Sequence, residues 1–126
     1  MPRRSETVEY LVELMRPWGA VTAKSMFGGW GLYREGLFFA IVADDVLYLK
    51  TDDETRAAFE AEHLDPFVFR SKDGTSTAMS YRRAPDEALE NPDEMARWAG
   101  LAYGAAVRAA ARKPPSRPKA AKSKRP

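Results

Sequence analysis

Apolar residues recur at helical spacing near the N-terminus, where they would share one face of a helix. This spacing predicts a helix from about Glu6 to Pro17. Ser5 precedes it and is a suitable N-cap, because its hydroxyl can accept a hydrogen bond from an unpaired backbone N–H. The apolar stripe consists of Val8, Leu11, Val12 and Met15.

Three short apolar runs follow and predict β-strands, at Trp30 to Tyr33, Leu37 to Ala43 and Val46 to Lys50. The middle run is apolar at consecutive positions, which indicates a central strand buried on both faces. The turn residues between the runs include Gly36, which can adopt positive φ at low cost, and the pair Asp44-Asp45. Such short connections favour antiparallel pairing.

A second helix is predicted from about Asp52 to His63, with Thr51 and Glu54 at the spacing of a capping box. After it, Phe67 to Arg70 and Thr77 to Arg83 predict a second hairpin. The loop between them contains an Asp-Gly pair, which is common in turns.

The last helix has the clearest start, because Asn91 can cap it and Pro92 suits the first helical position. Pro114 ends it. Its apolar stripe consists of Met95, Trp98, Ala99, Ala102, Ala105 and Ala106. The predicted order α-β-β-β-α-β-β-α indicates an α+β fold, with an antiparallel sheet of about five strands and helices packed on one face.

The length of 126 residues predicts one domain, residues 1–111, and a tail, residues 112–126. Cysteine is absent, which excludes disulfides and thiolate chemistry. The longest strongly apolar run, Leu37 to Ala43, is too short to cross a membrane. The N-terminus lacks the uninterrupted apolar core of a signal peptide. These features predict a cytoplasmic protein without membrane contact.

The net charge of +2 is unevenly distributed, since the tail holds seven basic residues and no acidic one. The remainder has 13 basic and 18 acidic residues, a net charge of −5. The tail composition, rich in Pro, Lys and Ala, predicts disorder. The tail is either a solubilising extension or a weak, sequence-independent contact to DNA or RNA phosphates. Its candidate contacts are Arg112, Lys113, Arg117, Lys119, Lys122, Lys124 and Arg125.

Three clustered glycines, Gly28, Gly29 and Gly31, invite comparison with phosphate-binding loops. Such loops are followed by a helix, whereas strand-like Leu32-Tyr33 follows here. The preferred interpretation is that these glycines permit a tight turn or a bulge where backbones approach closely.

No catalytic set or metal site is predicted, and we expect no cofactor. His63 is the only histidine and lacks Cys or His partners for a metal. Turn formation and helix capping account for the acidic residues Asp44, Asp45, Asp52, Asp53 and Glu54. A non-enzymatic protein is therefore expected, with catalysis by these residues as a weaker alternative.

Many aromatic residues lie on or beside the predicted strands. Core packing is the preferred interpretation, because stacking on nucleic-acid bases needs basic surroundings and the body is acidic. If the helices cover only one sheet face, however, aromatics on the other face would form a partner surface or a homodimer surface. The residues are Phe27, Trp30, Tyr33, Phe38, Phe39, Tyr48, Phe67, Phe69 and Tyr81.

A set of short motifs resembles the TfoX N-terminal domain family over about residues 5–108. The motifs are Met26-Phe27-Gly28-Gly29, Gly31-Leu32-Tyr33, Gly36, Phe39-Ala40, Leu47-Tyr48-Leu49-Lys50, Ser80-Tyr81 and Trp98. The resemblance implies a small α+β domain of regulators of bacterial competence and DNA transformation, which act with a transcription activator and are not known as enzymes. It supplies no catalytic residues. Full-length members carry a second, helical C-terminal domain, where this chain has the basic tail.

The resulting hypothesis is a non-enzymatic regulatory or adaptor domain whose body binds a protein, such as a transcription activator, and whose tail adds weak nucleic-acid affinity. The alternative is a nucleic-acid-associated protein that binds mainly through the tail.

Overall fold

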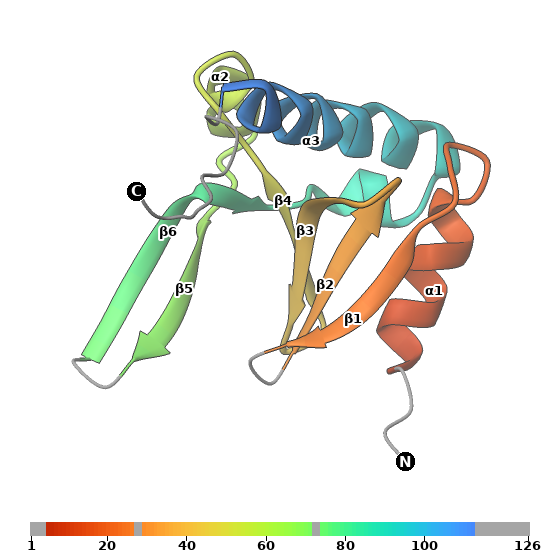
Figure 1. Cartoon of the computed structure of the whole chain (residues 1–126), viewed down its shortest axis with the longest axis horizontal. Helices are drawn as coiled ribbons and strands as arrows, with labels where there is room; N and C mark the ends of the chain where they lie inside the picture. Colours follow the sequence, from red (N-terminus) through yellow and green to blue (C-terminus); the bar gives the residue numbers. More distant parts are fainter. Residues whose placement is uncertain (1–4, 27–28, 72–73, 113–126) are drawn as a thin grey trace, which may run out of the picture.

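A six-stranded antiparallel sheet and three α-helices form the computed structural model (Figure 1), which describes residues 5–26, 29–71 and 74–112. The strand order across the sheet is β1-β2-β3-β4-β6-β5. The α+β class and the antiparallel sheet are thus confirmed, with one strand more than expected. The elements are α1 (Glu6–Met15), β1 (Thr22–Met26), β2 (Gly29–Arg34), β3 (Leu37–Ala43), β4 (Val46–Lys50), α2 (Arg56–Ala61), β5 (Pro66–Ser71), β6 (Gly74–Arg83), the 3-10 turn η1 (Asp86–Leu89) and α3 (Pro92–Arg112).

The strand that the pattern missed is β1, so the predicted order lacked its first strand. β1 lies at an edge of the sheet, pairs with β2, and has mostly exposed side chains. Because it buries little apolar surface, its sequence TAKSM carries no alternating hydrophobic signal.

The helix starts at Ser5 and Asn91 are confirmed. Ser5 Oγ accepts a hydrogen bond from the Val8 amide at 3.0 Å. Asn91 Oδ1 accepts from the amides of Asp93 and Glu94, at 2.8 and 3.2 Å. Both side chains therefore satisfy backbone donors that the first helical turn leaves unpaired.

The predicted start of the second helix was wrong, because α2 begins at Arg56 and the chain before it forms a turn. The reciprocal cap joins Asp52 and Thr55, one residue after the predicted pair. Asp52 Oδ1 accepts from the Thr55 amide at 3.3 Å, and Thr55 Oγ1 accepts from the Asp52 amide at 3.0 Å. The helix ends at Ala61. Two residues later His63 has positive φ (57°), and the Leu64 amide donates to the Phe59 carbonyl in a Schellman arrangement.

One face of the sheet packs against the helices. Alternating residues of β2, β3 and β4 join buried residues of α1, α2 and α3 in one hydrophobic core. Helix α3 crosses the sheet, and its predicted stripe is buried as expected (Figure 1). The largest fully buried side chains are Trp98, Phe39, Phe59, Leu11, Met15, Leu32, Leu49 and Met95.

A β-bulge interrupts the pairing of β2 with β3. Leu32 pairs with Ala40 and Tyr33 pairs with Phe38, so Phe39 has no partner in β2. Phe39 and Ala40 consequently both lie in the core, at 0% exposure, while Phe38 points to the other side. The hairpin loop before the bulge has positive φ at Glu35 (49°) and at Gly36 (83°), as predicted for Gly36 and as a type I′ turn requires.

Gly29 lies where two backbones approach closely, as expected for the glycine cluster. A Cβ at this position would lie 2.3 Å from the carbonyl oxygen of Val42 on β3. Gly28 and Phe27 lie outside the described residues.

We predict that Gly29→Ala lowers the free energy of unfolding by about 1–3 kcal/mol, because β2 must move away from β3. The matched control is Gly100→Ala in α3, where the nearest atom to the new Cβ would be 3.8 Å away. That substitution should raise the free energy by about 0.5–1 kcal/mol through helix propensity. Urea unfolding of both variants tests this, and equal midpoints would contradict it.

Candidate functional site

The sheet face turned away from the helices carries a row of three aromatic rings, Tyr33, Phe38 and Tyr81. The centroids of Tyr33 and Phe38 are 5.2 Å apart, and those of Phe38 and Tyr81 are 5.7 Å apart. Tyr33 and Phe38 come from the consecutive strands β2 and β3, whereas Tyr81 comes from β6, more than 40 residues further along the chain. We call these rings the aromatic row.

A lysine lies at each end of the aromatic row. The Lys24 ammonium is 5.0 Å from the ring centroid of Tyr33, and the Lys50 ammonium is 5.1 Å from that of Tyr81. Both distances fit cation–π contacts. Tyr81 is only 8% exposed, and its burial, together with nearby Tyr33, raises the pKa of its hydroxyl to about 12. The row therefore has a cation at either end, and Tyr33 and Phe38 are more exposed than the buried Tyr81.

Gly31 lies directly beneath side chains of the aromatic row. A Cβ at Gly31 would lie 2.8 Å from both Met26 Sδ and Phe38 Cε1, and 3.3 Å from Tyr33 Cε1. Three side chains thus pack over this position because it has none of its own. This contact gives a physical role to the Gly31-Leu32-Tyr33 motif.

A second aromatic pair joins β4 to β5 within the same sheet. The rings of Tyr48 on β4 and Phe67 on β5 have centroids 4.8 Å apart, and both residues are half-buried. Core packing, the preferred interpretation, therefore does not hold for these aromatic residues, which lie on the face opposite the helices as the alternative interpretation allowed. Trp30 and Phe39 instead belong to the helix-covered core.

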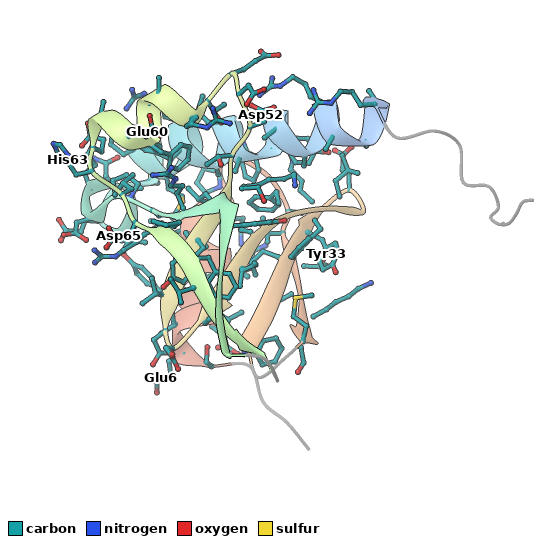
Figure 2. All side chains as sticks on the ribbon, turned by 90° about the vertical axis from the view of Figure 1, so that its left-hand side faces the viewer. Glu6, Tyr33, Asp52, Glu60, His63 and Asp65 are labelled. Atoms are coloured by element: carbon teal, nitrogen blue, oxygen red, sulfur yellow. The ribbon has the colours of Figure 1, made fainter. Side chains whose placement is uncertain are left out.

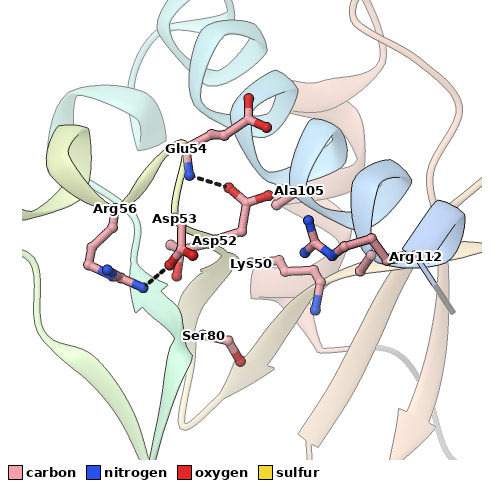
Figure 3. Close-up of a pocket in the computed structure, with 10 residues that line it drawn as sticks. Lys50, Asp52, Asp53, Glu54, Arg56, Ser80, Ala105 and Arg112 are labelled. Atoms are coloured by element: carbon pink, nitrogen blue, oxygen red, sulfur yellow. Dashed lines mark hydrogen bonds and ion pairs between the residues drawn. The ribbon is translucent and has the colours of Figure 1, made fainter.

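Beyond Lys50, the surface continues into a pocket of about 590 Å³ (Figure 3). The pocket lies between the end of β4, the turn before α2 and the C-terminal half of α3. Residues that line it include Lys50, Asp52, Ser80, Ala105 and Arg112. Lys50 and Arg112, predicted separately as a family motif residue and a tail contact, thus line the same pocket.

The Asp52 carboxylate is the best-connected charge at the pocket. Its Oδ2 lies 2.7 Å from Arg108 Nε, and its Oδ1 lies 3.1 Å from Arg108 Nη2, while Oδ1 also accepts the Glu54 amide at 3.0 Å. The hydrogen bonds from Arg108 hold the pKa of Asp52 below its usual value. Its neighbour Asp53 forms an ion pair with Arg56. Asp52 and Asp53 are therefore engaged in capping and ion pairs, while Asp44 and Asp45 have positive φ in the turn between β3 and β4.

The remaining predicted residues separate into three groups. Leu47 and Leu49 are core residues of β4. His63 is exposed beyond α2, and Figure 2 shows it on the opposite side of the molecule from Tyr33 of the aromatic row. Of the predicted tail contacts, Arg112 ends α3, whereas Lys113, Arg117, Lys119, Lys122, Lys124 and Arg125 lie outside the described residues.

Two residues that organise the site were not predicted, Lys24 and Arg108. Lys24 lies on the missed strand, so its place beside Tyr33 had no sequence signal. Arg108 lies three residues after Ala105, on the same side of α3 as the apolar stripe. A charged residue at this position could have suggested an ion pair with a neighbouring element. Its partner Asp52 is 56 residues away in sequence.

Within residues 5–26, 29–71 and 74–112, no three His, Asp or Glu side chains are gathered as metal ligands would be. Among the helices of the same ranges, none is both long and apolar enough to cross a membrane.

Comparison with known proteins identifies the family. The model of the TfoX N-terminal domain matches residues 13–106, so the chain belongs to the TfoX N-terminal domain family. The chain is also similar to Protein Sxy of Escherichia coli (strain K12), with 27% identity over 100 residues. The similarity covers 79% of this chain and 46% of Protein Sxy, so the chain spans about half the length of that relative.

We predict that Asp52→Asn lowers the free energy of unfolding at pH 7 by about 1–3 kcal/mol, because it removes a charge-assisted pair. Since the pKa of Asp52 is lower in the folded state, its contribution is present above pH of about 4 and is lost as pH falls through the folded-state pKa. The difference between wild type and variant should therefore narrow in acid.

The control is Asp53→Asn, because the Asp53 side chain is 90% exposed and its ion pair with Arg56 is screened by solvent. Its expected effect is below about 1 kcal/mol. Chemical unfolding from pH 2 to 8 measures both variants. A pH-independent difference for Asp52→Asn would show that its charge is not what stabilises the turn.

Proposed function

We propose that this chain is a non-enzymatic regulatory or adaptor domain that works in the cytoplasm and binds a protein involved in transcription or competence control. Membership of the TfoX N-terminal domain family and the similarity to Protein Sxy support a regulatory role. The family resemblance favours a transcription activator as the partner. The proposal assigns no catalytic residue, and His63 has no part in it.

The observation that carries a binding role is the free edge of β5. Within the described part of the chain, β5 pairs with β6 alone and has its other edge unpaired. Val68 on this strand is 52% exposed. An unpaired edge offers backbone N–H and C=O groups that can take up an extended segment of another protein.

The two edges of the sheet differ in a way that favours β5. The opposite edge, β1, presents exposed Lys24, and lysine on an edge discourages strand pairing. β5 begins instead with the apolar sequence PFVF. Apolar side chains on an open edge would contribute to partner affinity beside the backbone hydrogen bonds.

We predict that Val68→Lys reduces partner binding at least tenfold, because a charge on the edge would have to be desolvated when a strand is added. The matched control is Val107→Lys. Val107 is similarly exposed, at 44%, but lies on α3. The control should bind as wild type does.

The experiment uses the full chain as bait in lysate of its native host, with quantitative mass spectrometry of the retained proteins. The transcription activator that is recovered is then purified and titrated calorimetrically against wild type, Val68→Lys and Val107→Lys. Equal affinity of the two lysine variants would reject the β5 edge. Failure of the purified activator to bind wild type would reject the proposed partner.

A further inference from the structure

We propose that the sheet face opposite the helices binds single-stranded nucleic acid, with bases against Tyr33 and Phe38 and phosphates at Lys24 and Lys50. This inference goes beyond the proposed function, since the protein contact is assigned to the β5 edge and the two activities can be separated by mutation.

The charges of the strands support an anionic ligand. None of the six strands contains Asp or Glu, so the acidic residues in the described part of the chain lie in helices, turns and loops. The net charge of −5 that counted against base stacking is therefore an average that does not apply to the sheet face. The acidic residues nearest in sequence to the central strands, Glu35, Asp44 and Asp45, occupy hairpin turns.

The strand cations are divided between the two faces. Two arginines serve the helix side, where Arg34 lies 4.3 Å from the Trp18 ring and Arg82 donates to the Leu64 carbonyl. The open face receives Lys24 and Lys50, together with Arg83, which is the register partner of Tyr48 and also forms an ion pair with Asp86. This face therefore combines aromatic rings with positive charge and has no carboxylate at a strand position.

The spacing of these groups suits an extended strand of nucleotides. Lys24 is on β1 and Lys50 on β4, three strand intervals apart, which corresponds to about 14 Å across the sheet. Tyr33 and Phe38 lie between them and are half-buried, with part of each ring accessible. A chain crossing the strands would thus meet a cation, two rings and a second cation.

The chemistry favours unpaired bases over a duplex. Aromatic side chains stack on any base, and this contact requires that the base is not already stacked in a double helix. In the free protein the lysine ammoniums lie over tyrosine rings. When nucleic acid binds, the two ammoniums would turn from the rings to phosphates, and bases would stack on the accessible rings of Tyr33 and Phe38.

The surface proposed to bind nucleotides continues beyond Lys50. Lys50 and Arg112 line the same pocket, and beyond Arg112 the sequence holds six more basic residues and no acidic one. The aromatic face and the basic segment are separate features of the sequence, yet the fold brings the end of one to the start of the other.

The test measures fluorescence anisotropy of a labelled 20-nucleotide oligo-dT and of a 20-base-pair duplex with the full chain, over a series of salt concentrations. We expect tighter binding to oligo-dT. Phe38→Leu, and separately Tyr33→Leu, should weaken that binding about tenfold by removing a stacking ring. Lys24→Gln and Lys50→Gln should each reduce the magnitude of the log–log salt slope by about 0.7, the value for one phosphate contact on a single strand.

Three controls test for non-specific charge effects, for unfolding and for loss of protein binding. Arg16→Gln removes an exposed cation directly after α1, away from the sheet face, and should leave the salt slope unchanged. Thermal melts must show that the ring variants remain folded. Val68→Lys should bind oligo-dT as wild type does, so that loss of protein binding and loss of nucleic-acid binding can be distinguished.

A chain ending at Ala111 should bind oligo-dT more weakly and still lose affinity on Phe38→Leu. If that truncation abolishes binding while folded Phe38→Leu and Tyr33→Leu bind as wild type, the basic segment acts alone and the proposal is wrong. It is also wrong if wild type ignores oligo-dT and Phe38→Leu instead removes binding of the protein partner.

Discussion

Phe39 has no partner in β2, and this break in the pairing separates two groups of aromatic side chains. One group lies in the hydrophobic core and the other is the aromatic row. Side chains along a strand alternate between faces, so one extra residue in β3 changes which side chains reach the core. Phe39 packs with Trp18 beneath α3, with ring centroids 5.4 Å apart. Its neighbour Phe38 packs with Tyr33 on the opposite face. A single strand therefore supports both the hydrophobic core and the aromatic row.

The Arg108–Asp52 pair gives a second constraint, because it joins the long helix α3 to the turn that follows β4. Asp52 is held from two directions, by the guanidinium and by the amides of Glu54 and Thr55. Its carboxylate side chain is only 11% exposed, so removing one partner would leave a charge that water solvates poorly. The pair consequently fixes where the end of β4, and with it Lys50, lies relative to the last turn of α3.

Much of the fold could be predicted from residues that act locally. Ser5 and Asn91 cap their helices, and the stripe of α3 is buried, since these signals depend on a few neighbouring residues. Contacts between distant segments gave no such signal. Edge strand β1 buries too little apolar surface to form a pattern. The start of α2 was misplaced because Asp52 and Thr55 cap each other in a turn before the helix, and the contact of Asp52 with Arg108, 56 residues further on, had no local signal.

The candidate site was less predictable, since its parts act together only after folding. The aromatics and glycines were visible, but the close packing of Met26 and Phe38 over Gly31 follows from strand register.

Net charge was the least informative quantity, because a sum over the domain conceals where charges lie. Acidic residues suit helix starts and turns, where they meet unpaired amides. In the described part of this chain they lie in helices, turns and loops and are absent from the strands. A sheet that excludes carboxylates keeps whatever cations it has without neutralising partners in the same strands. An acidic domain can thus present a cationic face, provided that secondary structure sorts its charges. The same sorting gives the two sheet edges different characters, with Lys24 on β1 and exposed Val68 on β5. Separate surfaces for an anionic ligand and for a protein strand then follow from the distribution of a few side chains over one sheet.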